Sequence, residues 1–115
     1  MTLGTGVPVA LRAARRLVGE GVATRVMDLR WVLPLPVEDL LRESEAVGRV
    51  LVVDPTRASG GVSEGVLAAL VDGRFRGRVA RVAAADSFLP LGPAAADLLP
   101  SEESVVQTVR GLLAR

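Results

Sequence analysis

Three aspartates stand at or just after the ends of segments that the sequence predicts to be strands. Asp28, Asp54 and Asp86 each follow a run of apolar, partly β-branched residues. Open sheets of parallel strands carry functional groups at the carboxyl ends of their strands. Carboxylates there could form an acid–base pair or hold magnesium. They also cap loops and pair with arginines such as the nearby Arg30 and Arg57, and this structural role is the favoured interpretation.

The residue types that the chain lacks exclude several classes of catalytic site. The 115 residues include no Cys, His or Tyr, and all 14 basic residues are arginines. A disulfide framework, a thiolate nucleophile and a Cys/His zinc site are therefore excluded. A serine triad with an imidazole base, a Schiff-base lysine and a P-loop lysine are excluded as well. Carboxylates, hydroxyls, arginines and backbone groups remain.

Two glycine-containing segments could in principle bind a phosphate. The stretch Thr2–Pro8 has a Gly-x-Gly turn before a helix, but the third glycine of the dinucleotide fingerprint would fall at Val9. A tight turn explains these glycines. The stretch Ser59–Glu64, which reads S-G-G-V-S-E, could accept an anion at the start of a helix. We favour instead close packing of that helix start against a neighbouring strand or subunit.

The charge and hydropathy of the chain indicate neither a nucleic-acid partner nor a membrane. The formal net charge is +1, and a local cluster of arginines at positions 74, 76, 78 and 81 matches no nucleic-acid motif. We interpret that cluster as a solvated loop that leads into a strand. No apolar run reaches the roughly 20 residues of a membrane span, and no signal peptide is recognisable. We expect a cytoplasmic protein.

Hydrophobic periodicity predicts helices and strands in alternation along one domain, residues 1–115. Helices are expected over 7–18, 37–46 and 62–71 and after Ser101, and strands over 24–29, 49–54 and 78–83. Strands that alternate with helices predict crossover connections and a mostly parallel sheet. The predicted core comprises Leu11, Val26, Leu40, Val50, Leu51, Val52, Val53, Leu67, Leu70, Val79, Val82, Val109 and Leu112.

Three segments in register resemble a known family. The segment Val26–Pro36, V-M-D-L-R-W-V-L-P-L-P, is similar to the D-L-R-x-x-x-P-L segment of transketolase C-terminal domains. Arg49–Asp54 followed by Gly60–Glu64 resembles their strand-D-E and G-G-x-x-x-E stretch, and Asp86–Pro93 resembles their D-x-x-x-P loop. Within this family the chain looks most like the beta part of thiamine-diphosphate-dependent 2-oxoacid dehydrogenases, the decarboxylating component.

The resemblance implies a three-layer α/β/α domain that forms the last part of a larger enzyme. The intact enzyme would decarboxylate pyruvate or a branched-chain 2-oxo acid and pass the acyl group to a lipoyl arm. Thiamine diphosphate and magnesium would be held by preceding domains, so we expect this chain to bind no cofactor and to be inactive alone. Its partners would be the catalytic domains or subunits of the same enzyme, and possibly the acyltransferase core, in a homo- or hetero-oligomer.

The same resemblance implies an interface on the loops of this domain. Trp31, the only tryptophan, lies on a proline-bounded loop and could serve either as an interface residue or as a core anchor. The interface residues that we expect from the matching motifs are Arg30, Trp31, Arg57, Gly60, Gly61, Glu64, Phe88 and Pro90.

Two departures from the family pattern matter for the interpretation. Pro55 stands where the family commonly has a glutamate, so any role of that acid is lost. The family also has a longer strand before the first helix, whereas only Met1–Thr5 precedes it here, so the chain looks like a fragment or a remnant gene. We expect a shortened N-terminal strand, an unpaired sheet edge and association of the isolated chain.

Two other functions stay open from the sequence. The chain could be a stand-alone small-ligand or regulatory module that uses the crevice at the strand ends. It could also be the corresponding domain of a transketolase or of a deoxyxylulose phosphate synthase.

Overall fold

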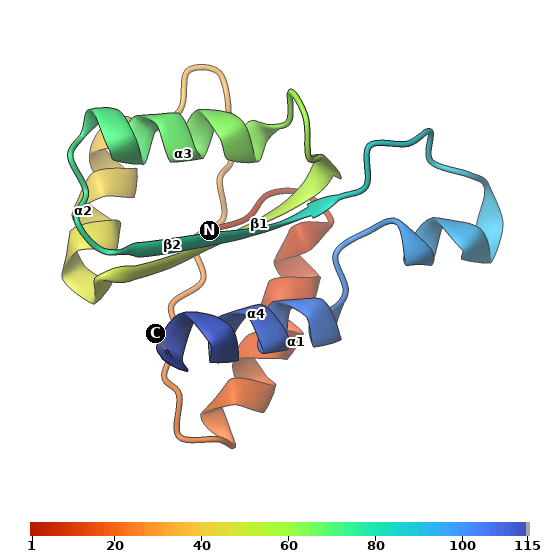
Figure 1. Cartoon of the computed structure of the whole chain (residues 1–115), viewed down its shortest axis with the longest axis horizontal. Helices are drawn as coiled ribbons and strands as arrows, with labels where there is room; N and C mark the ends of the chain where they lie inside the picture. Colours follow the sequence, from red (N-terminus) through yellow and green to blue (C-terminus); the bar gives the residue numbers. More distant parts are fainter. Residues whose placement is uncertain (115) are drawn as a thin grey trace.

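A computed structural model describes residues 1–114, which form three layers (Figure 1). A small parallel sheet lies between the pair α2 and α3 on one face and the pair α1 and α4 on the other. The elements are α1 (Gly6–Val18), α2 (Val37–Val47), β1 (Arg49–Arg57), α3 (Val62–Asp72), β2 (Arg78–Ala84), the 3-10 helix η1 (Gly92–Asp97) and α4 (Glu102–Ala114). The α/β class and the mostly parallel sheet predicted from the sequence are confirmed.

The sheet is built around β1 and β2, which pair in parallel and are joined by the crossover helix α3. Arg49 lies opposite Arg78, and Val53 lies opposite Val82. β1 extends past Pro55, where the sequence suggests an end, and its register shifts between Asp54 and Arg57. Proline has no N–H to donate, which explains why the regular ladder stops there.

The first residues of the chain lie in the middle of the sheet, on the side of β1 that faces away from β2. Thr2 forms parallel bridges with Asp28 on one side and with Val53 on the other. The order across the sheet is therefore residues 27–29, residues 1–3, β1 and β2. Residues 1–3 form only these isolated bridges and no regular ladder with either neighbour.

The strand expected over residues 24–29 is a wrong prediction, because only Asp28 forms a bridge. The segment is extended, and the Thr2 N–H donates to the Met27 carbonyl at 2.9 Å, while the Leu29 N–H donates to the Thr2 carbonyl at 2.7 Å. A ladder between two strands extends only as far as the strands lie side by side. The neighbour here is only residues 1–3, so the ladder stops after one bridge.

Two hydrophobic clusters cover the two faces of the sheet. The cluster on the face of α2 and α3 contains Leu29, Leu40, Val50, Val52, Val66 and Leu70. The cluster on the face of α1 and α4 contains Ala13, Leu17, Val53, Val105 and Val106. Most of the predicted core is buried or half-buried, and Val52 and Leu40 are fully buried.

Leu11 is the exception in the predicted core, since 44% of it is exposed. The buried stripe of α1 consists of Gly6, Ala10, Ala13 and Leu17, all but one of them small. A Cβ atom on Gly6 would lie only 2.2 Å from Thr2 Oγ1. The helix therefore lies so close to the sheet that it needs small residues there, and Leu11 is turned outward.

The helices of residues 1–114 are short. None of them is long and apolar enough to cross a bilayer.

Candidate interaction surface at the carboxyl edge of the sheet

Asp54, in β1, fixes the start of α3. Its carboxylate is fully buried and accepts hydrogen bonds from the Thr56 N–H at 2.8 Å, the Thr56 hydroxyl at 2.6 Å and the Ser63 N–H at 2.5 Å. The Thr56 hydroxyl oxygen in turn accepts from the Val62 N–H at 3.2 Å. A carboxylate at a helix start satisfies N–H groups that have no partner within the helix. Asp54 is thus an N-terminal cap for α3.

The environment of Asp54 keeps it ionised. Burial acts to raise the pKa of Asp54, but the hydrogen bonds from Thr56 and Ser63 together outweigh burial and lower the pKa below its ordinary value. The carboxylate therefore has neither the raised pKa nor the free oxygen that a general acid at neutral pH would need.

The other two aspartates have separate partners. Asp86 accepts from the Ser59 hydroxyl at 2.5 Å and from the Ser59 N–H at 2.8 Å, and these bonds lower its pKa. Asp28 pairs with Arg30 at 3.0 Å. Within residues 1–114 no three acidic side chains come together in a way that could hold a metal ion. The structural role favoured from the sequence is the one the geometry supports.

The glycine pair before α3 packs tightly against β1. A Cβ atom on Gly61 would lie 2.1 Å from the Arg57 carbonyl oxygen, so only glycine fits. Gly60 has a φ of 71°, a conformation that suits glycine, and its N–H donates to Glu64 at 3.0 Å. This confirms the close packing of the helix start on a strand. It also brings Arg57, Gly60, Gly61 and Glu64 together on the β1–α3 connection.

Of the arginines at positions 74, 76, 78 and 81, only Arg81 has a side chain that forms hydrogen bonds to other described residues. Its guanidinium donates to the Ala58 carbonyl at 2.8 Å and to the Ser63 hydroxyl at 3.2 Å. It therefore ties the end of β1 to the start of α3, while the other three side chains are exposed.

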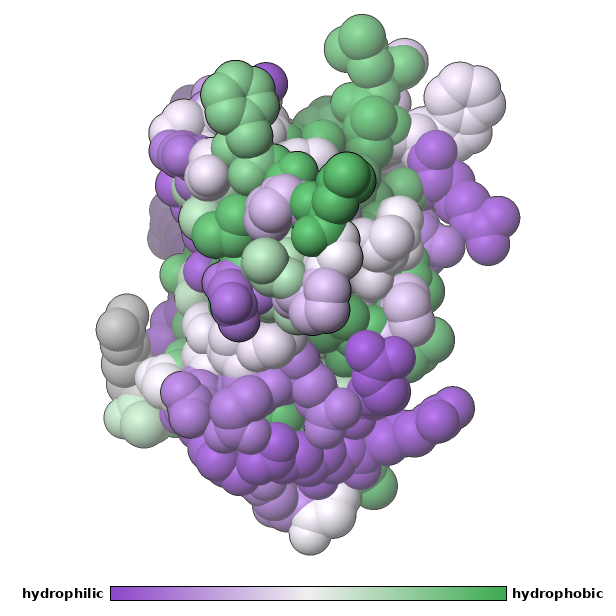
Figure 2. All heavy atoms as spheres, turned by 90° about the vertical axis from the view of Figure 1, so that its right-hand side faces the viewer, coloured by the Kyte–Doolittle hydropathy of each residue, from purple (hydrophilic) through white to green (hydrophobic). Residues whose placement is uncertain are grey.

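Large apolar side chains are exposed on the loops that follow the carboxyl ends of the sheet segments. Trp31 is 71% exposed on the loop after residues 27–29, and Phe88 is 98% exposed on the loop after β2. Trp31 is thus not a core anchor. Figure 2, which views the right-hand side of Figure 1, shows hydrophobic side chains gathered on the upper part of this face and hydrophilic ones below.

Sequence reasoning missed three members of this surface. Leu33, Leu89 and Leu91 are also exposed, with Leu33 at 88% and Leu91 at 98%. The sequence did contain a signal for them. All three leucines lie in proline-containing segments, and proline keeps such segments from forming a regular helix or strand. Trp31 and Leu33 lie on the loop before α2, and Phe88, Leu89 and Leu91 lie on the loop between β2 and η1, which Figure 1 shows well apart from the first. We call these five exposed side chains on two separate loops the carboxyl-edge surface.

The family of the chain follows from comparison with known proteins. Residues 1–105 match the family described as "Transketolase, C-terminal domain", and the chain belongs to this family.

Pyruvate dehydrogenase subunits and a transketolase are among the proteins that are similar to the chain. The chain is 33% identical to the pyruvate dehydrogenase E1 component subunit beta of Bacillus subtilis and 30% identical to that of Staphylococcus aureus. Both matches cover 98% of this chain but only 36% of the relative, so the chain spans about a third of their length. A solved structure described as "Split gene transketolase, inactive beta4 tetramer" superposes with a TM-score of 0.85 at 26% identity, over 98% of this chain and 37% of that one.

Proposed function

We propose that the chain is the C-terminal assembly domain of a thiamine-diphosphate-dependent 2-oxoacid dehydrogenase. The enzyme would oxidatively decarboxylate pyruvate or a branched-chain 2-oxo acid in the cytoplasm and pass the acyl group to a lipoyl arm. The observation that carries the proposal is the carboxyl-edge surface, which exposes a tryptophan and a phenylalanine on a chain similar throughout to E1 beta subunits. Exposed aromatic side chains of this kind are typical of the centres of protein interfaces.

The residues present do not fit the pyrophosphate of thiamine diphosphate. The start of α3 lies at the carboxyl ends of the strands and could accept a phosphate through its backbone N–H groups. Asp54 and Glu64 already accept hydrogen bonds from the N–H groups of Ser63 and Gly60 there. Two carboxylates at that position would repel a further anion. The proposal therefore assigns the cofactor and its magnesium to other parts of the enzyme.

The first test is a titration of the chain with thiamine diphosphate and magnesium. We expect isothermal titration calorimetry to show no binding at micromolar concentrations of the chain. One-to-one binding with micromolar affinity would overturn the assignment of the cofactor to other domains.

The partners in the proposal are the catalytic domains or subunits of the same enzyme, and possibly its acyltransferase core. We assign the contacts to Trp31, Phe88 and Pro90, with Arg30 and Arg57 as polar contacts around them. Gly60, Gly61 and Glu64 would shape the connection between these loops. The name of the structural neighbour, a tetramer, supports assembly into an oligomer.

A chimera tests the assembly role. The matched third of the Bacillus subtilis pyruvate dehydrogenase E1 beta subunit is replaced by residues 1–115, and assembly of the E1 component and decarboxylation of pyruvate are measured. We expect the chimera to assemble. Trp31→Ala and Phe88→Ala should weaken assembly, because each removes a large exposed apolar side chain from the carboxyl-edge surface.

The matched control is Val71→Ala, which removes a side chain that is 74% exposed on α3, away from the carboxyl-edge loops. Assembly of this variant should equal that of the unmodified chimera. If the Trp31 and Phe88 variants fold, as judged by circular dichroism, and assemble as well as the control, the interface lies elsewhere.

A second candidate is the same domain in a transketolase. It is favoured by the superposition on the split-gene transketolase with a TM-score of 0.85. A chimera built on that protein distinguishes the two candidates, because we expect assembly on the dehydrogenase subunit and none on the transketolase.

A further inference from the structure

The outer edge of β2, the side of this strand that faces away from β1, is a free edge of the sheet. Within residues 1–114, β2 pairs with no strand other than β1. The other elements that it contacts, α3 and α4, cover the two faces of the sheet (Figure 1). A strand at such an edge presents a row of unpaired N–H and carbonyl groups to which another strand can pair.

The hydrogen bonds at the two ends of β2 show which of its backbone groups are free. The Arg78 N–H donates to the Gly48 carbonyl at 3.0 Å, and the Ala84 carbonyl accepts from the Ala58 N–H at 2.9 Å. Alternate residues of a strand direct their N–H and carbonyl groups to the same side, so the even-numbered residues of β2 face β1. The residues whose backbone groups face the outer edge are Val79, Arg81 and Ala83.

No other part of the described chain occupies this edge. Among residues 1–114, no backbone hydrogen bond outside the β1–β2 ladder involves Val79, Arg81 or Ala83. Arg81 is exposed and the two apolar residues are half-buried. Three N–H groups and three carbonyl groups are therefore available to an extended segment of about five residues.

Arginines surround the amino end of this edge. The connection from α3 into β2, residues 72–81, holds four arginines and one acid. Three of those arginines and the first residue of β1 are exposed and form no ion pair with a described residue. We call these side chains, Arg49, Arg74, Arg76 and Arg78, the arginine cluster.

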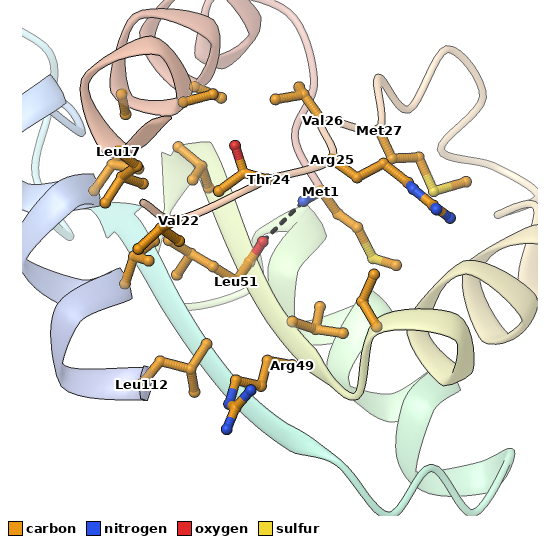
Figure 3. A pocket seen from close by; sticks show the side chains of 18 of the residues that line it. Met1, Leu17, Val22, Thr24, Arg25, Val26, Met27, Arg49, Leu51 and Leu112 are labelled. Carbon is orange, nitrogen blue, oxygen red and sulfur yellow. Dashed lines mark hydrogen bonds between the residues drawn. The ribbon is translucent and has the colours of Figure 1, made fainter. Parts of the chain in front are cut away.

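Arg49 and Arg78 lie on the face of the sheet that α4 covers. Val50 packs against the cluster beside α2 and α3, so its neighbour Arg49 lies on the opposite face. Figure 3 shows Arg49 near Leu112 of α4, and both residues line an apolar groove beside Met1. Arg78 is opposite Arg49 in the ladder and therefore shares this face. A residue added opposite Arg78 at the outer edge would place its side chain within reach of the guanidinium.

The charge of the edge argues against a second copy of the chain as the occupant. Two β2 strands could pair antiparallel about a two-fold axis. The register that pairs all three outward residues sets Val79 opposite Ala83 and Arg81 opposite its own copy. Like charges directly opposite one another destabilise such a pair. An acidic strand meets opposite charges at the same positions.

We propose that the outer edge of β2 binds an extended acidic segment of another polypeptide, which adds a strand to the sheet and pairs its carboxylates with the arginine cluster. A guanidinium matches a carboxylate with two parallel hydrogen bonds. Addition of a strand to free backbone groups is an established way to bind peptides. The inference is independent of the proposed function, because it uses no residue of the carboxyl-edge surface.

The experiment uses the whole chain and a fluorescein-labelled hexapeptide, Glu-Val-Glu-Val-Glu-Val, at low ionic strength. We expect saturable binding by fluorescence anisotropy and slower hydrogen exchange at the amides of Val79, Arg81 and Ala83. The amides of Ala80 and Val82 already face β1, so their exchange serves as an internal reference. Added salt should weaken binding, because it screens exposed ion pairs.

Two further peptides with the same label separate charge from backbone pairing. Lys-Val-Lys-Val-Lys-Val has reversed charges and should bind at least about tenfold more weakly. Glu-Pro-Glu-Pro-Glu-Pro keeps the carboxylates, but proline lacks an N–H and favours polyproline II over a strand. It should also bind at least about tenfold more weakly. Equal binding of the Glu-Pro and Glu-Val peptides would reduce the interaction to charge alone and overturn the proposal.

Three variants locate the site. Ala83→Pro removes an outward N–H and keeps the hydrogen bonds to β1, and edge strands accept proline at such positions. It should weaken binding by about tenfold or more. Arg78→Glu should weaken it by about fivefold or more, since it replaces an ion pair by a repulsion. The matched control Arg15→Glu makes the same change at an exposed position of α1, which does not contact β2, and should bind within about twofold of the unmodified chain.

The proposal stays testable if Ala83→Pro does not fold, because the Glu-Pro peptide removes the same hydrogen bonds without changing the protein. Four results would overturn it. One is the absence of saturable binding up to about 1 mM peptide. Another is binding that leaves exchange at the three outward amides unchanged. The third is a dimer in sedimentation that protects those amides, which would identify a second copy as the occupant. The fourth is tighter binding of a hexathymidylate that Arg78→Glu weakens, which would identify a nucleic acid as the ligand.

Discussion

The carboxyl edge of the sheet, where its strands end, and the amino edge, where they begin, differ in how completely their polar groups are paired. At the carboxyl edge, Asp54, Thr56 and Ser63 form a closed network, and Asp86 is held by Ser59. At the amino edge, the Met1 nitrogen donates one hydrogen bond to the Leu51 carbonyl, and an apolar groove lies beside it. The polar groups at the carboxyl edge are therefore paired with one another, whereas the amino edge is lined mainly by apolar side chains around a groove.

This difference determines what each edge can recognise. A partner at the carboxyl edge meets only side chains, of which Trp31 and Phe88 are the largest. The groove at the amino edge is instead lined by apolar side chains such as Leu17, Val22 and Leu112. The first edge therefore presents protruding side chains, and the second edge a concave apolar surface.

The largest expected effect is at the carboxyl edge. Asp54→Ala removes three hydrogen bonds to a buried carboxylate and leaves the Ser63 N–H at the start of α3 without its acceptor. We expect a loss of about 3 kcal/mol or more in the free energy of unfolding, measured with urea. Asp54→Asn keeps the size and one acceptor, and should cost clearly less. Equal stability of Asp54→Ala and the unmodified chain would mean that the network does not hold α3.

The next largest effect is at the amino edge, where we expect the free energy of unfolding to depend on pH. The pKa of the Met1 amine is about 6 in the folded chain against 8.0 unfolded, so between these values the unfolded chain binds more protons. Stability should rise as pH rises from about 6 to 8, by at most about 2.7 kcal/mol. Urea unfolding at several pH values measures this slope.

The composition simplifies that pH measurement. The chain has no His or Cys, so no side chain with an ordinary pKa titrates in this window. The matched control is the chain with an acetylated Met1, for which the slope should vanish. An unacetylated chain with a flat profile would show that the amine is solvated.

The smallest effect compares one valine from each region. Val52 in β1 is fully buried, and Val52→Ala should cost about 1–3 kcal/mol through lost burial and a residual cavity. Val26 beside the groove is half-buried, and Val26→Ala should cost less than about 1 kcal/mol. The two variants differ by the same two methyl groups, so urea unfolding compares burial alone. Equal losses of unfolding free energy would show that the surroundings of Val26 are as well packed as those of Val52.

Local patterns were sufficient to predict the parts of the fold that make their own contacts. The four apolar residues of 50–53 between charged neighbours predict a buried strand, and Ser101 before two glutamates predicts the start of α4. Residues 24–29 have the same kind of pattern and fail to form a strand. Whether such a segment forms a ladder depends on the length of its neighbour, which no local pattern contains.

The side of α1 that packs on the sheet was also beyond the sequence. Leu11 and Leu17 both lie on plausible apolar stripes, and the choice depends on how closely the helix approaches Thr2. For the carboxyl edge, residue types identified the loops of Trp31 and Phe88 but left the exposure of Trp31 open. The partners of Asp54 were hidden because Thr56 and Ser63 meet it only after β1 bends and α3 begins.

The position of residues 1–3 between Asp28 and Val53 also bears on the order in which the molecule acquires its shape. These residues are synthesised before either of their neighbours, and the contact with Leu51 spans 50 positions of the chain. Contacts between distant positions slow folding, because a long loop must close before the contact contributes any stability. Residues 1–3 must therefore wait for β1 to emerge, and we expect β1, α3 and β2 to be structured before the middle of the sheet is filled.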